Sequence, residues 1–300
     1  MSDLLVRAMA HEGRIRVMGV NITETVREAT RRHDLYPTAA AALGRLMGIT
    51  SILAGQLKND DDILIVKIIG DGPLGRIVVD ATKNGHIKGY VDNPHVNIIN
   101  EETKSLDVGK AVGQGQLHVT RNFGLKDDFT SSIDLVSGEI GDDFAQYFVQ
   151  SEQIGSAVSV GVLVNQDGSI ASAGALLIQM MPDAQEADIL IAQHVVDHLK
   201  PISQILDEGM PITELVSSIF EDVQILETSE VRFHCDCSKS QMIQLLTTLP
   251  TDDLEQLREK EEDIEMVCHF CNTKYQIQAN EILALIEAKQ HEHQKSTLSE

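Results

Sequence analysis

Stretches in which apolar and polar residues alternate fill much of the chain before residue 181 and predict β-strands. Residues 4–8 and 15–18 alternate on either side of a turn at residues 12–13, which predicts a hairpin. Asn84 and Gly85 form the sequence of a tight two-residue hairpin between two later strands. Further strands are expected over residues 63–69, 76–80, 87–91, 117–120, 133–136, 158–164 and 170–178.

Three segments of the same region are expected to be helical, and in the second the apolar residues recur at helical spacing. Residues 23–33 predict one helix, residues 39–57 a second and residues 144–153 a shorter third. Residues 1–181 are therefore expected to form one mixed α/β domain. Small residues in the second helix indicate close packing against a sheet: Gly44, Gly48 and Gly55.

The pattern changes at Pro182. Beyond it the chain shows helical spacing and no strand signal until about residue 231, with shorter helices expected over 202–206 and 212–220. The first of these helices is so broadly apolar that we expect it to be covered when the protein is at rest. Ordinary helical packing between domains is the simpler interpretation. One apolar stripe of this helix comprises Ala187, Leu190, Ile191 and Val195.

Composition and charge narrow the possible functions. The 300 residues are 42% hydrophobic, which is enough for a substantial core. Lys and Arg total 24 against 46 Asp and Glu, a formal charge of -22 that repels phosphate backbones and anionic lipid headgroups. The N-terminal segment is charged, and no apolar run approaches the roughly 18 residues that span a bilayer. We expect no signal peptide, no membrane anchor, and neither nucleic acid nor membrane as a partner.

Four cysteines form the strongest chemical signal. They stand in one Cys-x-Cys and one Cys-x-x-Cys pair near the end of a chain without an export signal, which favours metal or redox chemistry over a disulfide scaffold. Close thiol pairs that meet across a loop suit a tetrahedral zinc site with Zn–S distances of about 2.3 Å. His234 and His269 flank the pairs, but four thiolates already complete a closed site. The expected zinc ligands are Cys235, Cys237, Cys268 and Cys271.

These patterns together predict an α+β fold with a mixed N-terminal domain, a helical linker and a small C-terminal zinc-binding domain. The expected division is 1–181 for the N-terminal domain, 182–230 for the linker, 231–288 for the zinc-binding domain and 289–300 for a polar tail.

Zinc held by these thiols suggests a switch. A module of about 60 residues has a marginal core, whereas structural zinc supplies on the order of 10–16 kcal/mol, so loss of the ion should unfold it. Zinc needs thiolate ligands, and oxidation of the close pairs would abolish the site. Unfolding of the module would uncover the apolar linker, which predicts binding to other exposed apolar surfaces. A static zinc module, in which the metal only stabilises the fold, is the alternative.

The motifs resemble those of a known family, the thirty-three-kilodalton redox-regulated heat-shock chaperones of bacteria, over the whole length of the chain. The most specific similarities surround the cysteine pairs, VRFHCDC at 231–237 and VCHFCN at 267–272. Also similar are RRH at 31–33, PTAA at 37–40, GDGP at 70–73 and GEIGDDF at 138–144.

The resemblance implies an ATP-independent holdase rather than an enzyme. All four cysteines would hold zinc in the reduced, inactive state. Under oxidative stress the disulfides Cys235–Cys237 and Cys268–Cys271 would form, zinc would leave and the linker would become disordered. The family further implies unfolded or oxidatively damaged client proteins, an active homodimer, transfer of clients to ATP-dependent chaperones and a cytoplasmic location. Within the linker, the residues expected to bind clients are Leu190, Ile191 and Val195. The sheet of the N-terminal domain, residues 1–181, is the alternative surface for client binding and dimerisation.

Other interpretations agree less well with the chain. GDGPLG at 70–75 matches the dinucleotide-binding glycine pattern, but a strand rather than a helix is expected after it. A thiol-disulfide oxidoreductase that uses Cys268 and Cys271 would leave the other cysteine pair without a role. A zinc ribbon that binds nucleic acid conflicts with the charge of -22. The sequence has no P-loop motif, so ATP-driven chaperoning is not expected.

Overall fold

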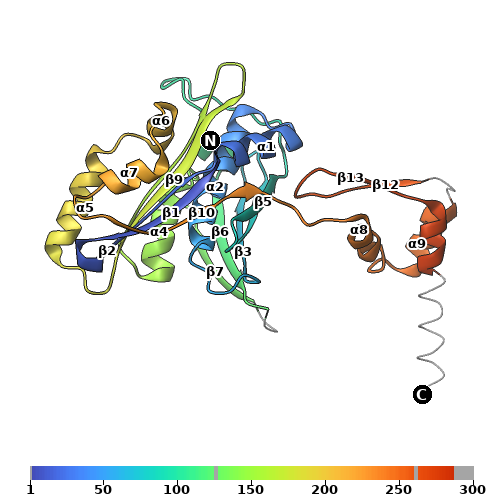
Figure 1. The fold of residues 1–300 in the computed structure, drawn as a ribbon. Coiled ribbons are helices and arrows are strands. Elements are labelled where there is room, and N and C mark those ends of the chain that lie inside the picture. Colours follow the sequence, from blue (N-terminus) through green and yellow to red (C-terminus); the bar gives the residue numbers. More distant parts are fainter. Residues whose placement is uncertain (1, 125–127, 260–262, 287–300) are drawn as a thin grey trace. The chain divides into compact units, whose positions relative to one another are not determined.

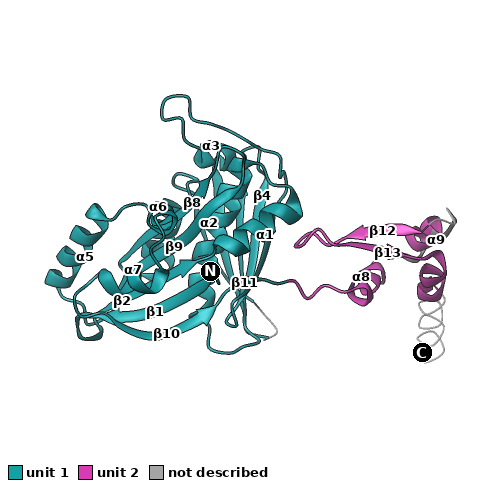
Figure 2. Ribbon diagram, turned by 45° about the horizontal axis from the view of Figure 1, so that its top comes forward, with its two compact units in different colours: residues 1–234 teal, residues 235–300 magenta. Residues whose placement is uncertain are grey.

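The computed structural model describes residues 2–124, 128–259 and 263–286 of the chain. Helices and strands form an α+β fold, which confirms the predicted fold class. The chain separates into two compact units, Met1–His234 (unit 1) and Cys235–Glu300 (unit 2), shown in Figure 2. Residues 182–230, the predicted linker, belong to unit 1.

Unit 1 contains two sheets. The first has five antiparallel strands in the order β10-β1-β2-β9-β8. Its β1–β2 pair is the hairpin that the opening alternation predicts. The bounds of its strands are β1 (Leu4–Ala10), β2 (Ile15–Asn21), β8 (Ser156–Val164), β9 (Ile170–Met180) and β10 (Gln224–Glu230).

The second sheet has six strands in the order β11-β5-β4-β3-β6-β7, of which only the β11–β5 pair is parallel. The predicted turn joins β4 to β5, but it has three residues, 83–85, rather than two. Gly85 has a φ of 73°, and an added Cβ would lie 1.9 Å from the carbonyl oxygen of Glu230, so the position requires glycine. The glycine pattern at 70–75 is the turn from β3 to β4, as expected. The bounds are β3 (Ile63–Gly70), β4 (Arg76–Thr82), β5 (His86–Val91), β6 (Gly115–Asn122), β7 (Phe129–Asp134) and β11 (Arg232–Phe233).

Helix α2 (Pro37–Ala54) contacts strands of both sheets and is the centre of the main core (Figure 1). An added Cβ at Gly48 would lie 3.0 Å from the Ala175 side chain, and one at Gly44 would lie 2.7 Å from Val162. These distances confirm the predicted close packing of this helix on a sheet. Helix and strands interlock because the small residues let the two backbones approach.

By length and composition alone, α2 would suffice to cross a membrane, with 18 residues at a mean hydropathy of 1.2. The expectation that no apolar run approaches this length is therefore wrong for α2. In the structure 89% of that stretch is buried, which identifies α2 as a core helix. It is apolar on all sides because strands surround it.

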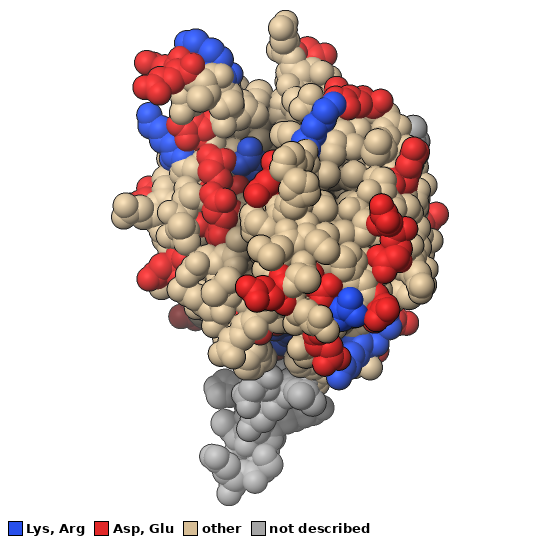
Figure 3. All heavy atoms as spheres, turned by 90° about the vertical axis from the view of Figure 1, so that its left-hand side faces the viewer, with Lys and Arg blue, Asp and Glu red and all other residues tan. Residues whose placement is uncertain are grey.

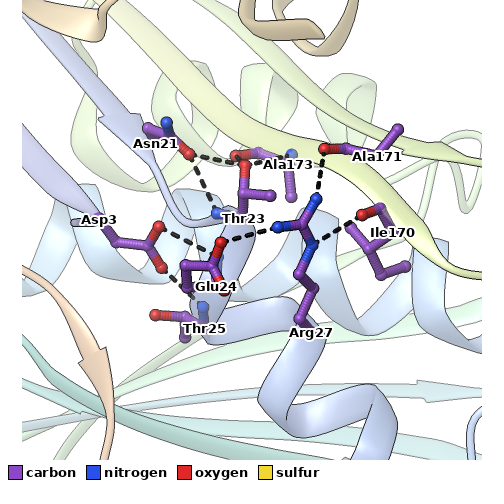
Figure 4. A network of polar contacts seen from close by, with 9 residues as sticks. All are labelled: Asp3, Asn21, Thr23, Glu24, Thr25, Arg27, Ile170, Ala171 and Ala173. Carbon is purple, nitrogen blue, oxygen red and sulfur yellow. Dashed lines mark hydrogen bonds and ion pairs between the residues drawn. The ribbon is translucent and has the colours of Figure 1, made fainter. Parts of the chain in front are cut away.

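Helix α1 (Thr23–His33) has the predicted bounds and is fixed at its start by a residue from the N-terminal strand region (Figure 4). The Asp3 carboxylate accepts hydrogen bonds from the backbone amides of Glu24 (3.1 Å) and Thr25 (2.6 Å). Asp3 therefore serves as a cap for amides that have no partner within the helix. Arg27 donates to the carbonyl oxygens of Ile170 (2.8 Å) and Ala171 (3.0 Å), which ties α1 to β9.

The phrase GEIGDDF forms a turn around one buried carboxylate. Asp143 accepts from the backbone amides of Val136 (2.7 Å), Ser137 (3.0 Å) and Ile140 (2.9 Å), and it is fully buried. It thereby supports Ile140, a buried residue at a φ of 73° that is unfavourable for a β-branched side chain. The other short helical elements before residue 181 are η1 (His11–Gly13), α3 (Val108–Val112), α4 (Gly141–Tyr147) and the π-helix η2 (Phe148–Glu152).

Most sequence-based boundaries agree with the structure within a few residues, with three differences. The second predicted helix ends at Ala54 rather than at 57. The strand expected at 133–136 lies at Phe129–Asp134, and the helix expected at 144–153 consists of α4 followed by η2.

The predicted linker forms three helices that pack on the first sheet, followed by a strand. Side chains such as Ile205 and Val216 join Val17 and Ile178 in a second apolar cluster. The absence of a strand before residue 231 was a wrong prediction, because β10 pairs with β1 along the edge of the sheet. Its consecutive exposed Ile225 and Leu226 follow no alternation, so only the hydrogen bonds to β1 define the strand. The helices are α5 (Glu186–His198), α6 (Ile202–Asp207) and α7 (Ile212–Ser218).

Helix α5 is only partly covered within unit 1. Ala192 is buried, whereas Leu190 is 65% exposed and Ile191 is 42% exposed. The expectation that this helix is covered is therefore wrong for its outer side within unit 1, because its contacts with the sheet involve one side of the helix. Figure 3 views the α5 side of unit 1 and shows a large uncharged area bordered by acidic side chains.

Unit 2 is small. Helices α8 (Lys239–Leu246) and α9 (Thr251–Glu259) precede an antiparallel hairpin of β12 (Ile264–Val267) and β13 (Lys274–Ile277). The Ser238 hydroxyl accepts from the Gln241 amide and caps α8. Its buried apolar side chains among the described residues are few: Met242, Leu246, Leu254, Ile277, Ile282 and Ile286.

Candidate metal centre

Local backbone structure presents each cysteine pair differently. Cys235 and Cys237 lie in an irregular segment between β11 and α8, and Cys268 and Cys271 lie in the turn between β12 and β13. That turn is closed by hydrogen bonds from the Cys268 amide to the Thr273 carbonyl oxygen (3.0 Å) and from the Asn272 amide to the Cys268 carbonyl oxygen (2.8 Å). The tight turn aims two sulfurs towards the other pair, as the Cys-x-x-Cys spacing predicts.

All four sulfurs lie within 4.8 Å of one another. Two close separations join the two motifs: Cys235 Sγ is 3.8 Å from Cys268 Sγ, and Cys237 Sγ is 3.2 Å from Cys271 Sγ. A zinc ion with four Zn–S bonds of about 2.3 Å needs sulfurs about 3.8 Å apart, so the cluster fits a tetrahedral site. His234 and His269 are outside this group of ligand atoms.

The chemistry of the donor set also suits zinc. Four thiolates select soft or borderline ions, and a closed four-sulfur shell leaves no position for a substrate. Cys268 and Cys271 are buried, whereas Cys235 and Cys237 are half-buried. The arrangement therefore resembles a structural metal site that is more accessible to solvent on the side of Cys235 and Cys237.

Three of the thiols have shifted pKa values, and the shifts differ in direction: Cys235, Cys268 and Cys271. Burial raises the pKa of Cys235 well above its ordinary value, and burial also raises the pKa of Cys268. At Cys271 burial acts in the same direction, but hydrogen bonds from the Thr273 hydroxyl and backbone amide outweigh it and lower the pKa to about 7. Without a cation, protons therefore remain on part of the cluster at neutral pH, and metal binding must displace them.

Two hydroxyl groups that the sequence analysis did not identify contact the sulfurs. Tyr275 donates from its hydroxyl to the Cys237 carbonyl oxygen (2.9 Å), and the Tyr275 hydroxyl oxygen also lies 3.1 Å from Cys237 Sγ. Thr273 Oγ1 lies 3.2 Å from Cys271 Sγ. Their closeness to Cys271 in sequence was the available signal, since a residue just after a metal-binding turn commonly supports its ligands.

The comparisons with known proteins identify the family. A family model described as Hsp33 protein matches residues 3–278. The chain belongs to the Hsp33 family. The 33 kDa chaperonin of Halalkalibacterium halodurans is 44% identical over 290 residues, which cover 96% of this chain and 99% of the relative. That of Bacillus cereus is 42% identical with the same coverage of both chains.

A solved structure agrees with this assignment. The crystal structure of the 33 kDa chaperonin from Thermotoga maritima, described as a heat shock protein 33 homolog, matches with a TM-score of 0.89 at 33% identity. The match covers 96% of this chain and 99% of that chain. Membership of the Hsp33 family confirms the predicted resemblance and supports a chaperone role, which entails binding of unfolded client proteins.

The apolar linker residues that are expected to bind clients form a second candidate site. Ile191 and Val195 line a cavity of about 720 Å³ together with residues 217–222 and the turn that contains His11 and Arg14. Leu190 is outside this lining and is the more exposed residue. The structure thus brings two of the three predicted client-binding residues to one cavity.

A buried carboxylate that the sequence analysis did not single out fixes α5. Asp188 lies 2.8 Å from His11 Nδ1 and 2.8 Å from Arg14 Nε, and it also accepts from the Gln185 amide at the start of the helix. The Arg14 guanidinium, with the Gln185 amide, holds the pKa of Asp188 far below its usual range. Asp188 thus joins the first turn of α5 to the turn between β1 and β2.

Proposed function

We propose that this protein is a redox-regulated, ATP-independent chaperone that holds unfolding proteins under oxidative stress. It is inactive when reduced and zinc-bound, and disulfide formation with zinc release activates it. The observation that carries the proposal is the cluster of four thiols within 4.8 Å in a small unit of an Hsp33 family chain. A cluster of this kind can exist either as a metal site or as disulfides, but not as both.

In the reduced state the four cysteines would hold the ion. When bound, zinc supplies cross-linking of the two cysteine motifs without any redox activity of its own. Cys235 and Cys237 anchor the segment before α8, and Cys268 and Cys271 anchor the β12–β13 turn. With few large apolar side chains buried in the described part of unit 2, this cross-link stabilises its fold.

Oxidation would convert the thiolates into the disulfides Cys235–Cys237 and Cys268–Cys271. In each step a peroxide accepts two electrons from two thiolate sulfurs, its O–O bond breaks, one S–S bond forms and two protons from solvent complete two water molecules. After both steps no thiolate remains to hold a cation. Unit 2 would then lose its stabilising cross-link, and the linker would become disordered.

Clients would bind to apolar surface of the linker, including Leu190, Ile191 and Val195. The exposed side chains on α5 and the cavity beside it support this location, because unfolded chains bind through exposed apolar groups. The active form would be a homodimer in the cytoplasm that later transfers clients to ATP-dependent chaperones. No catalytic step is part of this function.

The test follows zinc, thiols and client aggregation in one sample before and after peroxide with mild warming. Zinc and free thiols should disappear as suppression of aggregation appears without ATP, and a reductant with added zinc should reverse all three. Peptide mapping should find the two disulfides within the motifs. Constant activity with zinc still bound would favour the static zinc module instead.

A separate variant tests the client surface. Replacing Leu190, Ile191 and Val195 together with serine should lower the holdase activity of the oxidised protein several-fold, with unchanged zinc content in the reduced protein. Phe129→Ser with Val149→Ser is the matched control, because these side chains are 59% and 58% exposed elsewhere on unit 1. Full activity of a folded triple variant would contradict the assignment of this surface.

A further inference from the structure

The Tyr275 hydroxyl makes two contacts with one cysteine of the metal centre. It lies 2.9 Å from the Cys237 carbonyl oxygen, to which it donates, and 3.1 Å from Cys237 Sγ. The ring comes from β13, where Tyr275 pairs with Met266 across the hairpin that carries the other two cysteines. A side chain of the hairpin therefore contacts both the main chain and the sulfur of Cys237.

The Cys-x-Cys segment needs such support more than the other pair does. Cys268 and Cys271 lie in a turn closed by backbone hydrogen bonds and are buried. Cys235 and Cys237 lie outside any helix or strand and are half-buried. A ligand on an irregular, accessible segment keeps its position only if neighbouring groups hold it, and such groups commonly change metal affinity 10- to 100-fold.

From this geometry we infer that Tyr275 is a positioning residue of the metal centre. Its hydroxyl proton goes to the Cys237 carbonyl oxygen when the sulfur is protonated and to the Cys237 sulfur when that sulfur is negatively charged as a ligand. The single phenolic proton has two acceptors at similar distance, and a metal-bound, negatively charged sulfur attracts it more strongly than a carbonyl oxygen does. Tyr275 thereby slows loss of the ion and shields Cys237 from electrophiles. This role rests on the zinc binding proposed above.

The test is Tyr275→Phe in the full-length reduced protein, since this change removes one oxygen and keeps the ring. Zinc affinity, measured by competition with a chromophoric chelator, should fall about 10- to 100-fold, and zinc transfer to excess chelator should be faster. In the zinc-loaded variant, iodoacetamide should alkylate Cys237 faster relative to Cys271, as mapped by mass spectrometry. Tyr36→Phe is the matched control, because Tyr36 is 48% exposed on unit 1, and it should leave all three values unchanged.

The outcomes separate this role from the proposed function. Wild-type affinity, transfer rate and alkylation pattern in Tyr275→Phe would overturn the role of Tyr275 and leave zinc binding intact, whereas wild-type protein that binds no zinc would contradict the proposed function itself. A merely structural role would lower thermal stability without favouring alkylation at Cys237. If the variant does not fold, wild-type protein still gives an answer. The chain has no Trp and 4 Tyr, so removal of zinc should change the tyrosine absorption spectrum, and an unchanged spectrum would exclude the contact.

Discussion

The two units bury different kinds of groups. Unit 1 encloses the apolar helix α2 between two sheets and adds a second apolar cluster beneath the linker helices. Unit 2 buries few large apolar side chains among its described residues, and two of its four clustered cysteines are buried with them. Apolar burial stabilises unit 1 without a ligand, whereas the proposed function makes the fold of unit 2 depend on the metal that joins its sulfurs. Under the proposed function, a chemical signal at the sulfurs would therefore unfold unit 2, with disorder of the linker, and leave the α2 core of unit 1 folded.

Removal of zinc gives the largest expected difference between the units. Because structural zinc contributes on the order of 10–16 kcal/mol in small modules, a chelator under reducing conditions should unfold unit 2 and leave the α2 core of unit 1 folded. Hydrogen exchange should show loss of protection in α8, α9, β12 and β13 and unchanged protection in α2. Cys268→Ser should reproduce the effect without a chelator. Loss of protection in α2 together with unit 2 would show that the two units unfold cooperatively, contrary to this comparison.

The free energy of unfolding of unit 1 should instead depend on the buried Asp143 carboxylate, which accepts hydrogen bonds from backbone amides. Asp143→Ala leaves several buried backbone amides without an acceptor, which should lower the free energy of unfolding of unit 1 by about 3–5 kcal/mol. Urea denaturation measures the loss, and zinc affinity should not change. The control is Asp142→Ala, an exposed carboxylate one residue earlier, which should cost less than about 1 kcal/mol. Equal effects of the two substitutions would show that the hydrogen bonds to Asp143 do not stabilise unit 1.

Removal of the half-buried Asp80 carboxylate of unit 1 should instead raise the free energy of unfolding. Burial raises the pKa of Asp80 to about 6, although Lys88 and Lys67 act to lower it, and one of its oxygens has no hydrogen-bond partner. Since the folded state binds this proton more tightly than the unfolded state does, the stability of unit 1 should rise as the pH falls from about 7 towards 4. Asp80→Asn should add about 1–3 kcal/mol at pH 7.5 and flatten this dependence. A variant less stable than wild type at pH 7.5 would contradict the assignment.

The smallest expected effect is local to α5. Asp188→Asn weakens the contacts with His11 and Arg14, so residues 186–198 should exchange amide hydrogens faster while α2 and zinc content stay unchanged. Because the pKa of Asp188 is depressed in the folded protein, its contribution is present above the ordinary aspartate range and is lost only in strong acid. Asp197→Asn on the exposed side of the same helix is the control. Unchanged exchange in α5 would mean that apolar packing alone holds this helix.

The sequence determined the features that depend on neighbouring residues. The sequence predicted helix α1 with its observed bounds, and Asn84 and Gly85 predicted the position of the β4–β5 turn. The spacing within each cysteine pair identified the candidate ligands, which the structure brings together in one cluster. Turn geometry and side-chain periodicity are local properties of the backbone, so a pattern of adjacent residues is sufficient to predict them.

Tertiary structure alone decided the features that join distant segments. β10 is a strand because β1 offers it a row of hydrogen bonds, although its own residues do not alternate. Asp188 contacts His11 across 177 positions in sequence, and Tyr275 contacts Cys237 across 38. Whether such groups meet depends on how sheets and helices pack around the core. Hydrogen bonds between them form only after that packing has excluded water and fixed their positions, so no local pattern encodes them.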